Sequence, residues 1–416
     1  MARVKLVDLY ECVESALVAL GLSKSTLMKY RYTGFRPLQR FFEQKKCVFY
    51  SRKLAEKFVS ETLSDYESGL VSIFKYRRIR KVVAMLDEYK DTGTIKWAQL
   101  PNRNAAHLVC KYFETILTRY VSDLISKDRC SPSKIPNIKC IARHFLRYLE
   151  EQGCRNLHCL NRNIVSAFVP VIAKRQPGNM SSVISVMKSF LGYLYDNKYI
   201  ACELVSVFPR YPAKRKKHFE GFTREEAKAL ISSVPSDTNV GKRNIAIFTV
   251  GEGTGLRAVD VANLKLHDID WRHKTISVVQ NKTKRPLILP MENHVGDALA
   301  EYILHGRPNS DSPFVFLTAR QPFRPLSAQM VSQTTSRGSK KAGIENNLTF
   351  GKGFHCFRRG VGTWLLEAEL PLTIISEILG HTHVDSTKPY LSTDLDGLRE
   401  CAIGLEGIEI RKGVFQ

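Results

Sequence analysis

The first two hundred residues carry apolar side chains at helical spacing, and the pattern occurs twice. Apolar residues recur three and four positions apart around Phe41 and again around Phe145, as in helices that bury one face. At a separation of about 107 residues, Ser23–Lys46 shares its layout with Ser131–Gly153, and Arg80–Ile95 with Ser185–Ile200. This repeat predicts two copies of one small helical module, although two unrelated helical bundles would also look alike at this level.

After residue 208 the pattern changes. Pro209–Phe219 combines two prolines with a run of cations, which disfavours a helix interior and predicts an exposed linker. Thr223 and Glu226 then form a capping-box pattern at the start of an amphipathic helix. Two β-branched runs, Thr275–Gln280 and Pro286–Leu289, flank the sequence NKTKR and predict a β-hairpin.

Two further helices follow from local start and stop signals. Ser327 begins one that runs toward Gly343, and Pro371 begins a short one that Gly380 ends. The predicted fold class is therefore mostly α, with a small β-sheet in a C-terminal α+β domain. We expect helical modules at 1–105 and 106–208, a basic linker at 209–221, and a C-terminal domain at 222–416 whose tail is 391–416.

The charge balance indicates a polyanionic partner. The formal net charge is +23, and both signs are spread along the chain, which favours a folded nucleic-acid-binding surface over a disordered basic arm. A solvated basic face or, in the linker, a nuclear-localisation signal are the alternatives for individual cations. The candidate DNA contacts are Lys139, Arg143, Lys214, Arg215, Lys216, Lys217, Lys284 and Arg285.

The ten cysteines contain no CxxC pair and have irregular spacing, so we expect reduced cysteines in an intracellular protein. Cys154, His158 and Cys159 come nearest to a metal cluster, but ordinary loop packing is the favoured interpretation. The N-terminus lacks a signal-peptide pattern, and no apolar run is long enough to cross a bilayer. We therefore expect a soluble protein without a metal site.

Six residues in the C-terminal half have the chemistry needed to cut and rejoin a phosphodiester without a metal. They occur in TGLR, NKTKR, HCFRR and LGH, followed by a tyrosine nine residues after the LGH histidine. Two arginines can clamp one phosphate in a way that lysine cannot, and a tyrosine can attack when nearby cations stabilise its phenolate. Each residue alone has an ordinary explanation, but the ordered set is specific. The six are Arg257, Lys282, His355, Arg358, His381 and Tyr390.

From about Phe222 to about Leu405 this set closely resembles the tyrosine recombinase (phage integrase) family. The resemblance implies that Tyr390 attacks the phosphate and forms a 3′-phosphotyrosine that stores the bond energy. It also implies that Lys282 protonates the leaving 5′-oxygen, with Lys284 as the rival for this role. No cofactor, ATP or metal is implied.

The same resemblance gives the remaining site residues their roles. Arg257 and Arg358 would clamp the phosphate, His355 would orient the tyrosine and accept its proton, and His381 would bind the scissile phosphate. Asp260, three residues after Arg257, is expected to form a salt bridge within the domain.

The resemblance also implies the partners. The module before the linker resembles the family's core-binding, SAM-like domain, so the partner would be a double-stranded DNA recombination site, with possible accessory proteins. Strands would be exchanged in pairs through a Holliday junction by a tetramer. The apolar stripe from Leu395 to Leu405 would dock into a neighbouring copy, unless it packs on its own domain. We expect a bacterial, cytoplasmic, nucleoid-associated protein with no membrane partner.

Two other functions stay open at this point: a monomeric type IB topoisomerase, and a DNA-binding accessory protein with recombinase architecture. The sequence departs from the family pattern at Arg359 and Gly360, and at Lys388 and Pro389 just before the tyrosine. Because proline removes a donor and biases the preceding residue away from helix, the tyrosine is expected on an irregular segment that moves into place in an assembled complex.

Overall fold

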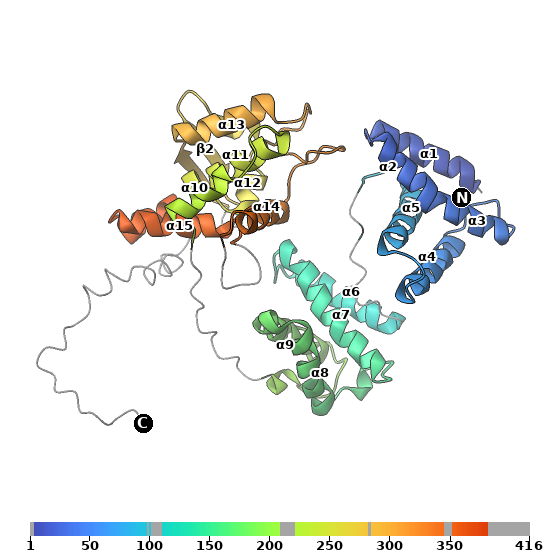
Figure 1. Ribbon diagram of the computed structural model, residues 1–416. Helices are drawn as coiled ribbons and strands as arrows, with labels where there is room; N and C mark the ends of the chain where they lie inside the picture. Colours follow the sequence, from blue (N-terminus) through green and yellow to red (C-terminus); the bar gives the residue numbers. More distant parts are fainter. Residues whose placement is uncertain are drawn as a thin grey trace, which may run out of the picture. The chain divides into compact units, whose positions relative to one another are not determined.

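The computed structural model describes residues 4–97, 100, 110–208, 221–281, 284–344 and 352–381. It divides into two compact units, one made by residues 96–215 and the other by the rest of the chain (Figure 1). The domain boundaries expected from the sequence remain predictions.

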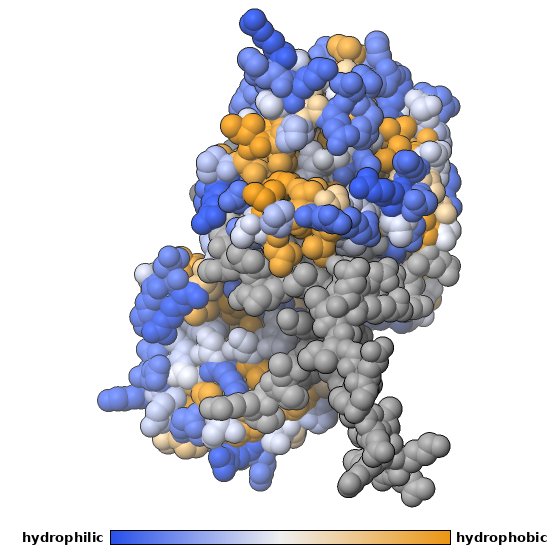
Figure 2. Space-filling view, turned by 90° about the vertical axis from the view of Figure 1, so that its left-hand side faces the viewer, coloured by the Kyte–Doolittle hydropathy of each residue, from blue (hydrophilic) through white to orange (hydrophobic). Residues whose placement is uncertain are grey.

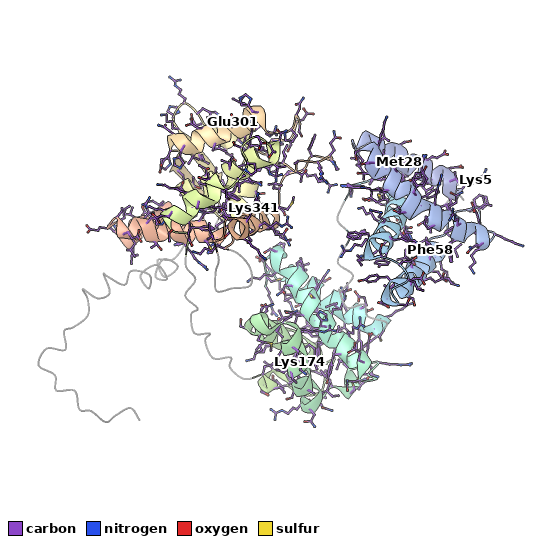
Figure 3. All side chains as sticks on the ribbon, in the orientation of Figure 1. Lys5, Met28, Phe58, Lys174, Glu301 and Lys341 are labelled. Atoms are coloured by element: carbon purple, nitrogen blue, oxygen red, sulfur yellow. A yellow bond between two sulfur atoms is a disulfide. The ribbon has the colours of Figure 1, made fainter. Side chains whose placement is uncertain are left out.

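The N-terminal helices form the first module. Their bounds are α1 (Leu6–Ala19), α2 (Lys24–Tyr30), α3 (Arg36–Gln44), α4 (Arg52–Glu67) and α5 (Ile73–Thr92), and a π-helical segment, Arg31–Phe35, joins α2 to α3. Serine side chains at positions 23, 51 and 72 cap α2, α4 and α5. Aromatic packing joins the helices, as where Phe41 of α3 meets Phe58 of α4 with ring centroids 4.8 Å apart (Figure 3).

The second helical module lies within the unit made by residues 96–215. It contains α6 (Lys111–Ser126), α7 (Ile135–Glu151), α8 (Arg162–Arg175) and α9 (Met180–Asp196). Phe145 of α7 is fully buried and packs edge-on against Phe168 of α8, and the Tyr120 hydroxyl donates a 2.9 Å hydrogen bond to Oγ of Ser189. These contacts hold the four helices around one apolar core.

The prediction that all cysteines are reduced is wrong at one place. Cys154 and Cys159 form a disulfide that closes the turn between α7 and α8, because this turn brings their Cα atoms to 6.3 Å. The seven other cysteines that the structure describes are free. His158 takes part in no metal cluster among the described residues.

Burial in the two helical modules follows the same register. Each buried residue of α1 corresponds to a buried residue of α6 that lies 107 positions later, as Leu6 does to Phe113 and Leu17 to Leu124. The same shift of 107 relates the buried residues Leu38, Phe41 and Phe42 of α3 to Phe145, Tyr148 and Leu149 of α7. Between α4 and α8 the shift of the buried positions is 110 residues. The N-cap residues Ser51 and Asn161 correspond at the same shift. This agreement supports the predicted duplication.

The C-terminal region combines helices with one small sheet, so the predicted fold class is confirmed. Strands β1 (Ile269–Asp270), β2 (Thr275–Val279) and β3 (Pro286–Pro290) pair antiparallel in that order, with Ile276 opposite Leu289. The helices are α10 (Arg224–Ser232), α11 (Asn239–Thr254), α12 (Ala258–Ala262), α13 (Asn293–His305), α14 (Ala328–Lys341), α15 (His355–Glu367) and α16 (Leu372–Ile378).

Helix α11 is the centre of this region. Ala246, Ile247, Phe248 and Val250 are all buried, and α10, α13 and α15 pack against the helix. Lys242 near its start pairs with Glu301 of α13 at 2.5 Å. Glu301 is labelled in Figure 3. The capping box at Thr223, the hairpin, and the helices that begin after Ser327 and Pro371 are confirmed.

The hairpin has one buried and one exposed face. Ile276 and Val278 point into the core, whereas Val279 and Ile288 are each 68% exposed.

The space-filling view shows apolar patches among polar residues in its upper part (Figure 2). No helix among the described residues is long and apolar enough to span a membrane.

Candidate active site

Four of the six predicted catalytic residues lie in described parts of the structure. They are Arg257, His355, Arg358 and His381. Lys282 and Tyr390 lie outside the described residues, as do the linker cations Lys214, Arg215, Lys216 and Lys217 and the whole tail, 391–416.

Arg257 stands where α11 turns into α12. Gly255 ends α11 with a φ of +60°, and Arg257 is the extended residue that precedes the first turn of α12. Its Nη1 donates to Oε1 of Gln280 at 2.8 Å, which joins α12 to the end of β2. The guanidinium of this half-buried residue is thus oriented by a fixed partner.

Arg358 is buried on α15, with a relative exposure of 1%. Its Nη1 donates to the carbonyl of Gly255 at 3.1 Å, and its Nη2 donates to the carbonyl of Leu379. A buried guanidinium needs such acceptors because burying an unpaired charge is costly. These two bonds attach α15 both to the turn before Arg257 and to the turn before His381.

Gln280 connects the same parts from the other side and was not predicted as a site residue. Its side chain is fully buried, and its Nε2 donates to the Leu379 carbonyl at 3.1 Å while its Oε1 accepts from Arg257. A β-carbon on Gly380, whose φ is +61°, would lie 2.4 Å from Gln280 Nε2, so this approach requires glycine. The alternation of side chains along a strand could have predicted that Gln280 is buried. Ile276 and Val278 face inward, and Gln280 is the next residue on the same face.

The two histidines lie at helix ends. His355 is exposed at the first position of α15, and His381 follows the left-handed Gly380, with its backbone N–H bonded to the Ser376 carbonyl at 2.8 Å. Between His355 and Arg358, burial raises the pKa of the Cys356 thiol. That cysteine therefore stays protonated near neutral pH and acts as a packing residue.

Asp260 does not form the predicted salt bridge with any described residue. Its carboxylate is 3% exposed, and Oδ1 accepts the backbone N–H of Asn281 at 2.8 Å. Oδ2 is buried without a hydrogen-bond partner among the described residues. Because Asn281 immediately precedes Lys282 in the sequence, this bond attaches Asp260 to the start of the hairpin turn.

The predicted DNA-contacting residues outside the candidate active site differ in exposure and in ion pairing. Lys139 on α7 is exposed, whereas Arg143 is partly buried and pairs with Glu114 of α6 at 2.6 Å. Lys284 and Arg285 are exposed at the hairpin turn, and Lys284 has a φ of +57°. Two backbone hydrogen bonds close the turn. The Gln280 N–H donates to the Arg285 carbonyl, and the Lys284 N–H donates to the Gln280 carbonyl.

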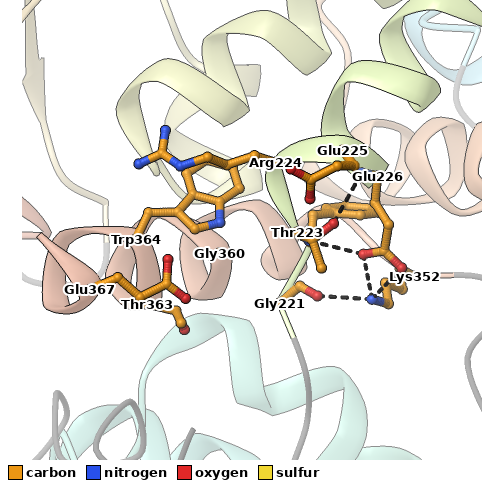
Figure 4. A pocket seen from close by; sticks show the side chains of 11 residues that line it. Gly221, Thr223, Arg224, Glu225, Glu226, Lys352, Gly360, Thr363, Trp364 and Glu367 are labelled. Atoms are coloured by element: carbon orange, nitrogen blue, oxygen red, sulfur yellow. Dashed lines mark hydrogen bonds and ion pairs between the residues drawn. The ribbon is translucent and has the colours of Figure 1, made fainter. Parts of the chain in front are cut away.

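The chain enters the C-terminal region across α15. The N–H of Phe222 donates to the Cys356 carbonyl at 3.0 Å, and a β-carbon on Gly221 would lie 2.3 Å from the backbone nitrogen of Gly360. Beside this crossing, Nζ of Lys352 donates to both oxygens of Glu226 at 2.8 and 2.6 Å and to the Gly221 carbonyl at 2.9 Å (Figure 4). The end of the linker is thus attached to the helix that carries His355 and Arg358.

The two partners of this ion pair should respond unequally to substitution. The Lys352 side chain is 3% exposed and that of Glu226 is 27% exposed. Glu226→Gln leaves a buried ammonium unpaired and should lower the free energy of unfolding by about 3 kcal/mol. Lys352→Met leaves a carboxylate that water can reach, so its cost should be smaller, about 1–2 kcal/mol. Urea denaturation followed by tryptophan fluorescence measures both.

Thr223→Ala is the control, since it removes the other half of the capping box at a cost of about 1 kcal/mol and leaves the ion pair intact. Equal losses in Glu226→Gln and Lys352→Met would contradict the asymmetry.

Comparison with known proteins identifies the family. Residues 220–395 match the phage integrase family. The protein y4gC of Sinorhizobium fredii, named as a candidate integrase/recombinase, is 37% identical over 185 residues, which cover 44% of this chain and 94% of y4gC. Tyrosine recombinase XerD of Mycobacterium tuberculosis is 25% identical over 307 residues, covering 69% of this chain and 96% of XerD. The XerH site-specific recombinase, solved in a post-cleavage complex with its palindromic difH substrate, has the same fold, with a TM-score of 0.55 at 15% identity over 71% of this chain and 97% of XerH.

The chain therefore belongs to the phage integrase family, the tyrosine recombinases, which are enzymes that break and rejoin DNA. The resemblance stated from the six residues is confirmed at the level of the family. The roles of the individual residues remain predictions.

Proposed function

We propose that this chain is a site-specific DNA recombinase that cleaves one strand with Tyr390 and rejoins it to another. The observation that carries the proposal is the link between the two predicted catalytic arginines. Arg257 bonds to Gln280, Gln280 and Arg358 both bond to the Leu379 carbonyl, and His381 follows two residues later. Segments far apart in the sequence are thereby held as one frame for a phosphate.

In this proposal the frame supplies positive charge in a fixed orientation. Arg257 and Arg358 neutralise the non-bridging oxygens, and preorganised donors of this kind supply most of the catalysis in phosphoryl transfer. His355 takes the proton of Tyr390 as the phenolic oxygen attacks phosphorus, and His381 donates to the same phosphate. Lys282 gives a proton to the departing 5′-oxygen.

The covalent product is a 3′-phosphotyrosine, and its bond to the DNA keeps the energy of the broken phosphodiester. Attack by the 5′-hydroxyl of a second strand releases the tyrosine and joins the two strands, so no ATP is consumed. Asp260 supports the general acid through the Asn281 N–H, since it holds the turn that begins one residue before Lys282. We place Asp260 as a positioning residue, distinct from the groups that touch the phosphate.

We further propose that the substrate is a double-stranded recombination site and that four copies act together through a Holliday junction. The tail, with its apolar stripe from Leu395 to Leu405, would dock into a neighbouring copy. Accessory proteins would select the direction of the reaction. The net charge of +23 supports binding to a polyanion of this kind.

The test is the trapping of a covalent adduct. Duplexes tiled across both flanks of the encoding element are nicked near their centres, so that the released 5′-hydroxyl oligonucleotide diffuses away and religation fails. We expect the wild-type chain to form an adduct that survives detergent and boiling at one site. Binding without any adduct would favour the accessory protein, and relaxation of a supercoiled plasmid that lacks the site would favour the topoisomerase.

A further inference from the structure

The π-helical segment Arg31–Phe35 and helix α3 of the N-terminal module carry an exposed basic and aromatic stripe. It consists of Tyr32 in the π-helical segment and of Arg36 and Arg40 on α3, and all three side chains are exposed. The Arg36 guanidinium lies over the Tyr32 ring at 4.1 Å from its centroid. Arg40 follows Arg36 by four residues and therefore extends the same side of the helix.

The carboxylates around this stripe are engaged by other residues: Glu43, three residues after Arg40 on α3, accepts a hydrogen bond from Gln39 at 2.9 Å. Among the described residues, neither Arg36 nor Arg40 forms an ion pair, whereas Arg31 on the same helix pairs with Glu14 of α1. Other acids of the module are engaged elsewhere, as Asp87 and Asp91 both pair with Arg52. The stripe is therefore a net positive surface.

In the second helical module, the arginines at the equivalent positions form ion pairs with glutamates. At the shift of 107 residues that relates the buried positions, Arg36 corresponds to Arg143 and Arg40 to Arg147. There, Arg143 pairs with Glu114 at 2.6 Å and Arg147 pairs with Glu151 at 3.1 Å.

At the same shift, the two glutamates correspond to neutral residues in the first module. Glu114 corresponds to Val7 and Glu151 corresponds to Gln44. Both modules thus keep the arginine pair, and only the N-terminal one lacks the carboxylates. The arginines of the N-terminal module are left available for an external anion.

We infer that the stripe of Tyr32, Arg36 and Arg40 binds the phosphate backbone of duplex DNA that flanks the segment held by the rest of the chain. A guanidinium is suited to phosphate because its planar donors can engage two oxygens at once, and stacking on Tyr32 limits the orientations of Arg36. These contacts add affinity without reading bases. The inference rests on the proposed function only for the identity of the DNA as a recombination site.

The test compares two double variants of the full chain that remove the same charge. Arg36→Gln with Arg40→Gln neutralises the stripe, and Lys53→Gln with Lys57→Gln neutralises two exposed cations, also four residues apart, on α4. Binding to a labelled 60-base-pair duplex of arbitrary sequence is measured between 50 and 200 mM salt. Circular dichroism confirms that both variants are folded.

Each phosphate contact contributes a slope of about −0.9 to the plot of log affinity against log salt concentration, so loss of two contacts should make the stripe variant's slope shallower by about 1.8. Between 50 and 200 mM salt, this slope change alters the affinity of the stripe variant relative to the wild type by about tenfold. We expect an unchanged slope for the α4 variant. Equal slopes in the two variants, whether both changed or both unchanged, would overturn the inference and leave a protein partner as the alternative.

This outcome is separable from the proposed function. If the wild-type chain forms no covalent adduct with any duplex but only the stripe variant shows the shallower slope, the proposed function fails and the inferred DNA-binding surface stands. If the adduct forms and the two variants have equal slopes, the proposed function stands and the inferred surface fails.

Discussion

Tyr390→Phe should abolish the covalent protein–DNA adduct while leaving DNA binding at the wild-type level. The substitution removes one oxygen, the proposed nucleophile, and keeps the ring and the charge of the surrounding cations. Because no other protein hydroxyl in the proposed mechanism attacks the intact phosphodiester, residual cleavage should fall below detection. A gel-stable adduct on a nicked duplex that the wild type cleaves is the measurement.

A control is needed because a phenylalanine could also disturb folding or assembly. Tyr302→Phe alters a buried tyrosine of the same region whose hydroxyl accepts the Leu317 N–H at 3.3 Å and takes no part in the proposed chemistry. It should keep adduct formation when corrected for the fraction folded. Any adduct formed by Tyr390→Phe would remove Tyr390 from the role of nucleophile.

Lys282→Ala should lose cleavage of ordinary DNA by about 10²- to 10³-fold and recover it on a substrate with sulfur at the bridging 5′ position. The reason is that a thiolate leaves without a proton, so a missing general acid no longer matters. Initial rates of adduct formation on the two matched substrates give the ratio directly.

Two further variants make this result specific. Arg257→Ala should show no rescue by sulfur. That arginine is proposed to neutralise the charge on the non-bridging oxygens, so the defect of the variant does not depend on the leaving group. Lys284→Ala separates the two lysines of the hairpin turn. Rescue in Lys284→Ala and not in Lys282→Ala would reverse the assignment of the general acid.

Local patterns along the chain were sufficient to predict part of the secondary structure. The capping box at Thr223, the hairpin and the left-handed Gly380 after α16 depend on neighbours a few residues away, so their signals are contained in short stretches. The repeated apolar register of the two helical modules has the same origin, since burial of one helix face imposes a period of 3.6 residues. The ordered set of six polar residues likewise predicted the family, which the comparisons confirm.

The tertiary structure alone decided which residues meet across long separations. Gln280 links Arg257 to Leu379, and Lys352 pairs with Glu226 across 126 positions of sequence. Asp260 bonds to a backbone N–H 21 positions away, where a salt bridge was expected. In each case the partner is determined by the way the helices and the hairpin pack, and by the tendency of buried polar groups to form hydrogen bonds. Sequence periodicity determines which face of an element is buried, but the identity of the group that it meets there depends on elements that pack together only in the folded chain.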